Sequence, residues 1–212
     1  MNIPEKTISR QTERVRRMFL TWIKFMEQEV DFWAIPGDLD IHTQGHCERV
    51  LMHALRIGEA RHASDRQMLA LAHASIFHDT RRKDNYLDTG HGARAAAHYR
   101  EFCDKGKLLF LPEAYAAIWY HDRDDELGEK YIGSHTAEGS ERDAWIEVYH
   151  DFKDADGLDR LRLGAWCLDP KFLRTPEAKT MIPFAQQLVE DTIPPQELQH
   201  TYDLTAPFRP KT

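Results

Sequence analysis

A histidine and an aspartate, His78 and Asp79, stand side by side directly after the apolar stretch Met68 to Phe77. Adjacent residues of a helix point about 100° apart, so both side chains can bind one ion only if it lies beside the helix end. A histidine nitrogen and a carboxylate oxygen form a mixed ligand set that suits manganese, iron, zinc, cobalt or nickel. This pair is therefore the first candidate for a metal site.

A third candidate ligand, His46, lies upstream in the segment GHCERVLMHAL. On a helix it shares a face with the apolar residue Val50, and a buried histidine needs a partner because leaving it unpaired is costly. His42 and His53 could take its place, although neither is followed by the pattern HxxRV that begins at His46. We expect His46 to be the ligand.

The fourth candidate is Asp156, in the segment KDADGLD. It follows Phe152 by one helical turn, so it faces inward and must be neutralised there. Asp154 lies two residues away and points to the opposite side of a helix. Asp159 shares the face of Asp156 and could either support the site or pair with Arg162. We expect Asp156 to be the ligand.

The order of these residues, His46, then His78-Asp79, then Asp156, resembles the His…His-Asp…Asp order of the HD superfamily of metal-dependent phosphohydrolases. The surrounding segments agree, since HxxRV begins at the first histidine, an apolar helix ends in FHD, and KxADxLD surrounds the last acid. The resemblance covers about residues 45–163. It implies an HD-type helical domain that holds one or two divalent ions, among Mn, Fe, Ni, Co, Zn and Mg.

Two more histidines, His91 and His121, lie between the His-Asp pair and the last acid. Members of the superfamily with two metals have histidines in this interval, and the resemblance then implies that Asp79 bridges the ions while His91 and His121 hold the second one. The spacing departs from that pattern, because His91 follows Asp79 by only 12 residues. With a single metal, both histidines would instead face the substrate phosphate.

The residue three positions after Asp79 is Arg82, where the single-metal nucleotidases of the superfamily carry a glutamate. The turn offers Arg81, Arg82 and Lys83 instead, and arginine suits bidentate contact with phosphate. We expect Asp79 to orient the attacking water and Arg81 and Lys153 to neutralise charge on the phosphoryl group. This disfavours a deoxynucleoside monophosphatase and favours a phosphomonoester or phosphodiester hydrolase acting on a small, nucleotide-like substrate.

Two other functions stay open at this point. One is a di-iron oxygenase of the same superfamily, which cleaves its substrate with oxygen. The other is a ligand-sensing domain that keeps the fold without turnover.

Composition sets the broader limits. The chain has 212 residues, 42% of them hydrophobic and 30% charged, which suits a single domain over 1–212. No stretch is apolar enough to span a membrane, and three cysteines without a CxxC pair suit a cytoplasmic protein. A net charge of −7 disfavours binding to an extended nucleic acid. The sequence leaves room for a homo-oligomer.

The elements that must position these side chains are all helical. Apolar residues recur at steps of three and four, and no stretch alternates with the period of a strand. The glycine-rich, acidic segment 122–139 predicts a long loop that could act as a lid or binding loop. We expect an all-α bundle with helices at 12–30, 40–60, 64–77, 93–102, 113–120 and 141–153, a segment after 157, and helices at 177–190 and 195–203.

Overall fold

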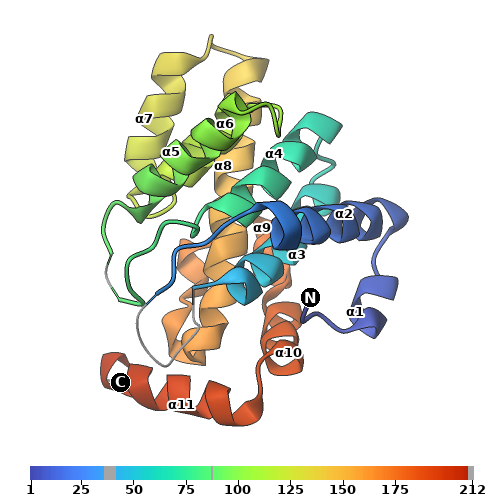
Figure 1. Ribbon diagram of the computed structural model, residues 1–212, viewed down its shortest axis with the longest axis vertical. Coiled ribbons are helices and arrows are strands. Elements are labelled where there is room, and N and C mark those ends of the chain that lie inside the picture. Colours follow the sequence, from blue (N-terminus) through green and yellow to red (C-terminus); the bar gives the residue numbers. More distant parts are fainter. Residues whose placement is uncertain (36–41, 87, 210–212) are drawn as a thin grey trace.

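The computed structural model describes residues 1–35, 42–86 and 88–209, and their regular structure is entirely helical (Figure 1). This confirms the predicted all-α fold class. The α-helices are α1 (Glu5–Ser9), α2 (Glu13–Glu29), α3 (Gln44–Ala60), α4 (Asp65–Phe77), α5 (His91–Asp104), α6 (Pro112–Tyr120), α7 (Asp125–His135), α8 (Ser140–Leu158), α9 (Pro176–Thr180), α10 (Ile182–Thr192) and α11 (Pro195–Thr205). Short 3-10 helices follow, η1 (Asp159–Leu163), η2 (Ala165–Cys167), η3 (Pro170–Phe172) and, after α11, η4 (Ala206–Phe208).

Local side-chain contacts explain where two of the long helices begin. The side chain of Thr12 accepts a hydrogen bond from the backbone N–H of Val15 at the start of α2. Ser64 and Gln67 form a reciprocal capping box at the start of α4, the start expected from the sequence. The helix expected from residue 40 begins at Gln44, and residues 40 and 41 lie outside the described part of the chain.

The expected loop over 122–139 is wrong, because α7 occupies most of that segment. The glycine that suggested a loop, Gly128, lies inside this helix and lets it approach α8 closely. A Cβ atom at Gly128 would lie 2.4 Å from the Cζ atom of Tyr149. The residue therefore serves helix packing and not chain reversal.

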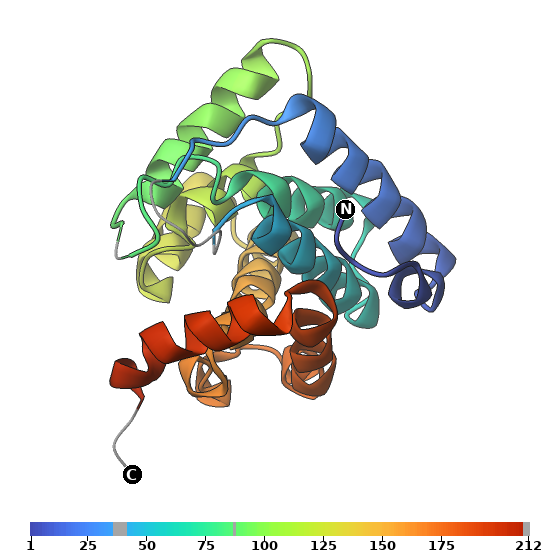
Figure 2. The same ribbon diagram turned by 60° about the horizontal axis from the view of Figure 1, so that its bottom comes forward.

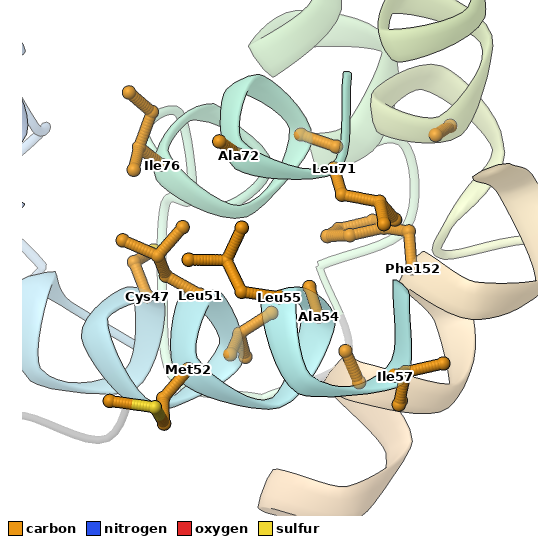
Figure 3. Packing of buried hydrophobic residues seen from close by; sticks show 14 of the residues in the cluster. Cys47, Leu51, Met52, Ala54, Leu55, Ile57, Leu71, Ala72, Ile76 and Phe152 are labelled. Carbon is orange, nitrogen blue, oxygen red and sulfur yellow. The ribbon is translucent and has the colours of Figure 1, made fainter. Parts of the chain in front are cut away.

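Helix α3 is central and packs against α2, α4 and α8. Figure 3 shows Leu51 and Leu55 of α3 pointing toward α4, and Leu71 of α4 lying near Phe152 of α8. These side chains are fully buried, and burying one large apolar side chain contributes about 1.5–3 kcal/mol to stability. The packing fixes the relative positions of α3, α4 and α8, which carry the candidate ligands.

The C-terminal helices cover one end of the bundle. Figure 2 shows α11 lying across that end with α10 beside it, and both helices contact η1. In the described residues, no helix combines the length and apolarity needed to cross a lipid bilayer.

Candidate metal centre

Five helix ends carry the histidine and aspartate residues that the sequence singles out. The start of α3, the end of α4, the start of α5, the end of α6 and the last turn of α8 contribute to one cluster. The predicted ligands in it are, in chain order, His46, His78, Asp79, His91, His121 and Asp156, and His42 joins them in a group with His46 and Asp79. Residues far apart in the sequence therefore meet because the bundle aligns these helix ends.

One group of ligand atoms surrounds Nε2 of His46. It lies 3.0 Å from Nε2 of His78, 3.3 Å from Oδ1 of Asp156 and 3.5 Å from Oδ2 of Asp79. Two atoms that bind one ion at bond lengths near 2.1 Å, with bond angles of 90–109°, lie about 3.0 to 3.4 Å apart. The atoms of His46, His78 and Asp156 lie within 3.9 Å of one another and could hold a single divalent ion. Oδ2 of Asp79 lies 3.9 Å from Nε2 of His78.

A second group of ligand atoms uses the other oxygen of Asp79. Oδ1 lies 3.2 Å from Nε2 of His91 and 3.6 Å from Nε2 of His121, and the two histidine nitrogens are 2.8 Å apart. Asp79 thus presents Oδ2 to the first group and Oδ1 to the second.

In each of the four histidines of these groups, a hydrogen bond at Nδ1 orients the ring. In every case Nδ1 lies within hydrogen-bond distance of an oxygen: Asp159 Oδ2 for His46 (2.7 Å), Ser75 O for His78 (2.9 Å), Asp88 O for His91 (2.8 Å) and Ile118 O for His121 (2.8 Å). Because an oxygen acceptor requires a donor, Nδ1 carries the proton and a neutral ring has its lone pair on Nε2. Lone pairs face each other at 3.0 and 2.8 Å, an arrangement that a cation between them would stabilise.

The charges within the cluster also suit a cation. Burial lowers the pKa of His78 to about 3, so its ring is neutral near pH 7. Burial alone would raise the pKa of Asp79, but the surrounding imidazoles, His78 first, hold it well below its ordinary value. Asp79 is 3% exposed, and its Oδ1 atom accepts no hydrogen bond in the described structure. A neutral His78 beside a buried, ionised Asp79 is the state that metal binding requires. Burial opposes protonation of His121, but the neighbouring Asp79 outweighs it and raises the pKa of His121.

A cavity of about 410 Å³ opens on the cluster. Three arginines line it together with the ligands, Arg82, Arg160 and Arg162. Nη1 of Arg82 lies 3.7 Å from Oδ1 of Asp79 and 3.1 Å from Nε2 of His91. Asp122 also lines the cavity, where its Oδ2 accepts a hydrogen bond from the backbone of Gly90. Its Oδ1 lies 3.6 Å from Nε of Arg123 and accepts no hydrogen bond within the described part of the chain. The volume is in the range of sites for small molecules.

No model of a protein family, no curated protein and no solved structure matches this chain. The described residues do contain buried histidine and aspartate groups that could hold a metal ion. The resemblance to the HD superfamily stays a prediction from motif order, so the function must be inferred from the geometry of the site.

Asp159, for which the sequence left two roles open, has both. Its carboxylate is fully buried, accepts from Nδ1 of His46, and lies 3.4 Å from Nη1 of Arg162. Arg49 is the partner that the sequence did not reveal, since its Nε and Nη2 atoms donate to both oxygens of Asp159 at 2.7 and 3.1 Å. Its position one helical turn after His46 is the signal that could have found it. Burial opposes ionisation of Asp159, but Arg49 and His46 together hold its pKa well below the ordinary value.

The two alternatives to the predicted ligands, Asp154 and His42, differ in their distance from the cluster. Asp154 accepts hydrogen bonds from the backbone N–H groups of Arg174 and Thr175, so the structure does not bring it into either group. His42, considered as a substitute for His46, lies beside it instead. Nδ1 of His42 is 3.1 Å from Oδ2 of Asp79, and burial lowers the pKa of His42 to about 3.

The structure does not bring Arg81 and Lys153 into the cavity. Arg81 donates to the backbone oxygen of Asp31 at 2.7 Å and to its carboxylate at 2.9 Å. Nζ of Lys153 lies 2.6 Å from Oδ1 of Asp125 in α7. Both cations are paired elsewhere, and Arg82 is the residue of the basic turn that lines the cavity.

Proposed function

We propose that this protein is a metal-dependent phosphohydrolase of the HD superfamily that binds two divalent ions and acts on a nucleotide-like phosphomonoester or phosphodiester. One observation carries the proposal. The Nε2 atoms of His46 and His78 face each other at 3.0 Å, and those of His91 and His121 at 2.8 Å, while every Nδ1 atom is held by an oxygen. A cation at each position would relieve the contact between lone pairs.

The position of Asp79 supports two ions rather than one. Its Oδ2 atom lies near His42, His46 and His78, and its Oδ1 atom lies near His91 and His121, so a single carboxylate could serve both ligand groups. The chemistry that divalent ions supply in such a site is activation of a water molecule and neutralisation of charge on a phosphoryl group.

The arginines of the cavity favour a phosphorylated substrate. Arg82, Arg160 and Arg162 lie on the wall of a cavity that belongs to a chain with a net charge of −7. A guanidinium matches the geometry of phosphate oxygens, so these residues would bind and orient the substrate. Among the described residues Oδ1 of Asp122 accepts no hydrogen bond, so it could accept one from a substrate hydroxyl at the cavity wall.

The proposal is tested by metal analysis joined to a substrate screen. Purified protein is loaded with Mn, Ni, Fe or Mg, its metal content is measured, and phosphate release from nucleotides, cyclic dinucleotides and simple phosphodiesters is followed. Asp79→Ala should remove both metal and hydrolysis, whereas Asp169→Ala, at an exposed position, should change neither. Hydrolysis that persists in the metal-free Asp79→Ala protein would contradict the proposal.

The same experiment separates the two rival functions. A di-iron oxygenase would use the same ligand groups, so it predicts near-stoichiometric iron and oxygen uptake during turnover. A ligand-sensing domain predicts binding of a phosphorylated ligand without product. The three arginines favour a phosphorylated ligand, which speaks against the oxygenase, and turnover separates the hydrolase from the sensing domain. Phosphate release without oxygen consumption is the expected result.

A further inference from the structure

A second cavity, of about 400 Å³, lies between α1, α3 and α10. Helices α1 and α10 are joined by an ion pair, in which Nζ of Lys6 lies 3.8 Å from Oδ2 of Asp191. The residues that line this cavity do not include any that line the metal cavity. Any ligand it holds would therefore bind at a separate site.

Arg56 of α3 is the most constrained residue in this second cavity. Its guanidinium carbon lies 4.0 Å above the ring of Phe184, and Nη1 donates to the side chain of Gln11 at 2.5 Å. Nε is buried and has no hydrogen-bond partner, and among the described residues no carboxylate pairs with this guanidinium. Burial lowers the pKa of Arg56 accordingly. A partly buried cation without a counter-ion is unfavourable unless a ligand provides one.

The other charged residues of the cavity add to this imbalance. Lys6 and Arg10 also line it, and Asp191 is the one acid among the described lining residues. The cavity therefore presents three cations against one carboxylate, in a chain whose net charge is −7. This local excess of positive charge favours an anion with two or more negative charges.

His53, one turn before Arg56 on α3, is a second polar group in need of partners. It is fully buried, and neither ring nitrogen has a hydrogen-bond partner in residues 1–35, 42–86 and 88–209. Its ring meets Phe184 edge-on at 5.9 Å between centroids. Unsatisfied polar groups thus lie at both Arg56 and His53, each beside the ring of Phe184, although only Arg56 lines the cavity. Native proteins have few such groups, and a bound ligand or water is one explanation.

We propose that this cavity binds a small phosphate-bearing anion, with Arg56, Lys6 and Arg10 as its ligands. The planar guanidinium of Arg56 suits phosphate oxygens, and the two exposed cations, Lys6 and Arg10, can contact a ligand from the rim. Arg56 follows His46 by ten residues on α3, so the two sites lie about 15 Å apart along one helix axis. The site does not depend on the proposed hydrolysis, because it shares no residue with the metal cavity.

The test is a calorimetric titration of inorganic pyrophosphate into the full chain, in the presence of EDTA and at low ionic strength. We expect a binding event that weakens roughly tenfold in Arg56→Gln and in the double variant Lys6→Gln/Arg10→Gln, and that weakens with added salt. Arg100→Gln is the matched control, because Arg100 also stacks on a phenylalanine at 4.0 Å but has a carboxylate partner, Asp104. Its affinity for pyrophosphate should equal that of the wild type.

The double variant keeps the test decisive if Arg56→Gln fails to fold, since Lys6 and Arg10 are exposed. Equal affinity in the wild type and the double variant would overturn the proposal. A parallel titration with ATP distinguishes the source of the phosphate: tighter binding than pyrophosphate identifies a nucleotide, and weaker binding identifies a free inorganic anion. No metal or turnover enters this assay, so its failure is distinct from failure of the proposed hydrolase.

Discussion

The Oδ2 atom of Asp159 lies 2.7 Å from Nδ1 of His46, and this contact determines which nitrogen of the ring faces the ligand cluster. The carboxylate is itself fixed by two hydrogen bonds from Arg49, one turn further along the same helix as His46. His46 is thus held by an ion pair that joins α3 to η1. Such outer contacts orient a ligand ring and raise its basicity.

Asp159→Asn should therefore weaken the first metal position without removing any of its ligands. We expect the affinity for Mn²⁺ to fall by roughly 10- to 100-fold, measured by calorimetry. The free energy of unfolding should fall by about 3 kcal/mol, because Arg49 is left buried without its counter-ion. Unchanged Mn²⁺ affinity in a folded variant would show that Asp159 does not orient His46.

The pH dependence of this ion pair has a definite sign. The pKa of Asp159 is lower in the folded protein than in the unfolded chain, chiefly because Arg49 and His46 outweigh the effect of burial. Its contribution to stability is therefore complete above about pH 4 and is lost as the pH falls through the folded-state value. Acid unfolding in the presence of EDTA should show a smaller loss of stability below pH 4 in Asp159→Asn than in the wild type.

Asp154 and Asp156 lie two residues apart on α8 but have different contacts, so substitutions at the two positions can be compared directly. Asp156 lies beside the metal ligand His46, and Asp154 binds the backbone after α8. Asp156→Asn should lower the affinity for the first ion by more than about 100-fold, a larger loss than removal of an outer contact gives. Asp154→Asn should keep the metal content and lower stability by about 1–3 kcal/mol, since Asp154 accepts bonds from two backbone N–H groups after α8. Metal analysis and thermal unfolding check both results. Equal metal loss in the two variants would contradict the choice of Asp156.

Helical phase made part of this site predictable. The apolar run before His78 and Asp79 indicates a helix that ends there, and α4 does end at Phe77. The same reasoning separates Asp156 from Asp154, because residues two apart on a helix face different sides. Local periodicity was enough for these assignments, since each depends only on neighbours within one or two turns.

The roles of the long cations could not be predicted in this way. Arg81 pairs with Asp31, 50 residues earlier, and Lys153 pairs with Asp125 on a helix that the sequence suggested was a loop. A flexible side chain follows whichever carboxylate the tertiary structure places near it. Arg82, which follows Arg81, was not favoured as a phosphate-binding residue from the sequence. Its burial beside Asp79 depends on the tertiary structure.

Arg82 should lower the affinity of the second metal position, at Asp79 Oδ1, His91 and His121, relative to that of the first. Its Nη1 atom lies 3.7 Å from Oδ1 of Asp79 and 3.1 Å from Nε2 of His91, so its charge repels an ion bound there. Arg82→Gln should therefore lower the dissociation constant of the second Mn²⁺ ion roughly tenfold. Titration of metal content against free Mn²⁺ measures this.

Arg81→Gln is the control for that experiment, because Arg81 bonds to Asp31 and does not line the cavity. It should leave both dissociation constants unchanged. Second-ion affinity that is the same in Arg82→Gln and the wild type would mean that the guanidinium turns away when metal binds. Under the proposed function, Arg82→Gln should also raise KM for the phosphorylated substrate, because one phosphate-binding group is lost.

The pKa of Asp151 on α8, a residue outside the metal cluster, is shifted in the opposite direction to that of Asp159. Burial raises its pKa from 3.8 to about 7, although Arg61 lies 2.8 Å away and acts in the other direction. Because the folded-state value is the higher one, folding favours the protonated acid. The contribution of Asp151 to the free energy of unfolding is complete below the unfolded-state pKa. It is lost as the pH rises from about 4 to about 7.

Asp151→Asn removes that titration while keeping the size of the side chain. The stability of the variant relative to the wild type should therefore increase between about pH 4 and pH 7 and stay constant outside this window. The rise is at most about 4 kcal/mol for a shift of this size. Thermal unfolding with EDTA at pH 5 and pH 8 measures it, and Asp143→Asn, at an exposed position of α8, should show no such trend. A constant difference across the whole range would mean that Arg61 keeps Asp151 ionised in the folded protein.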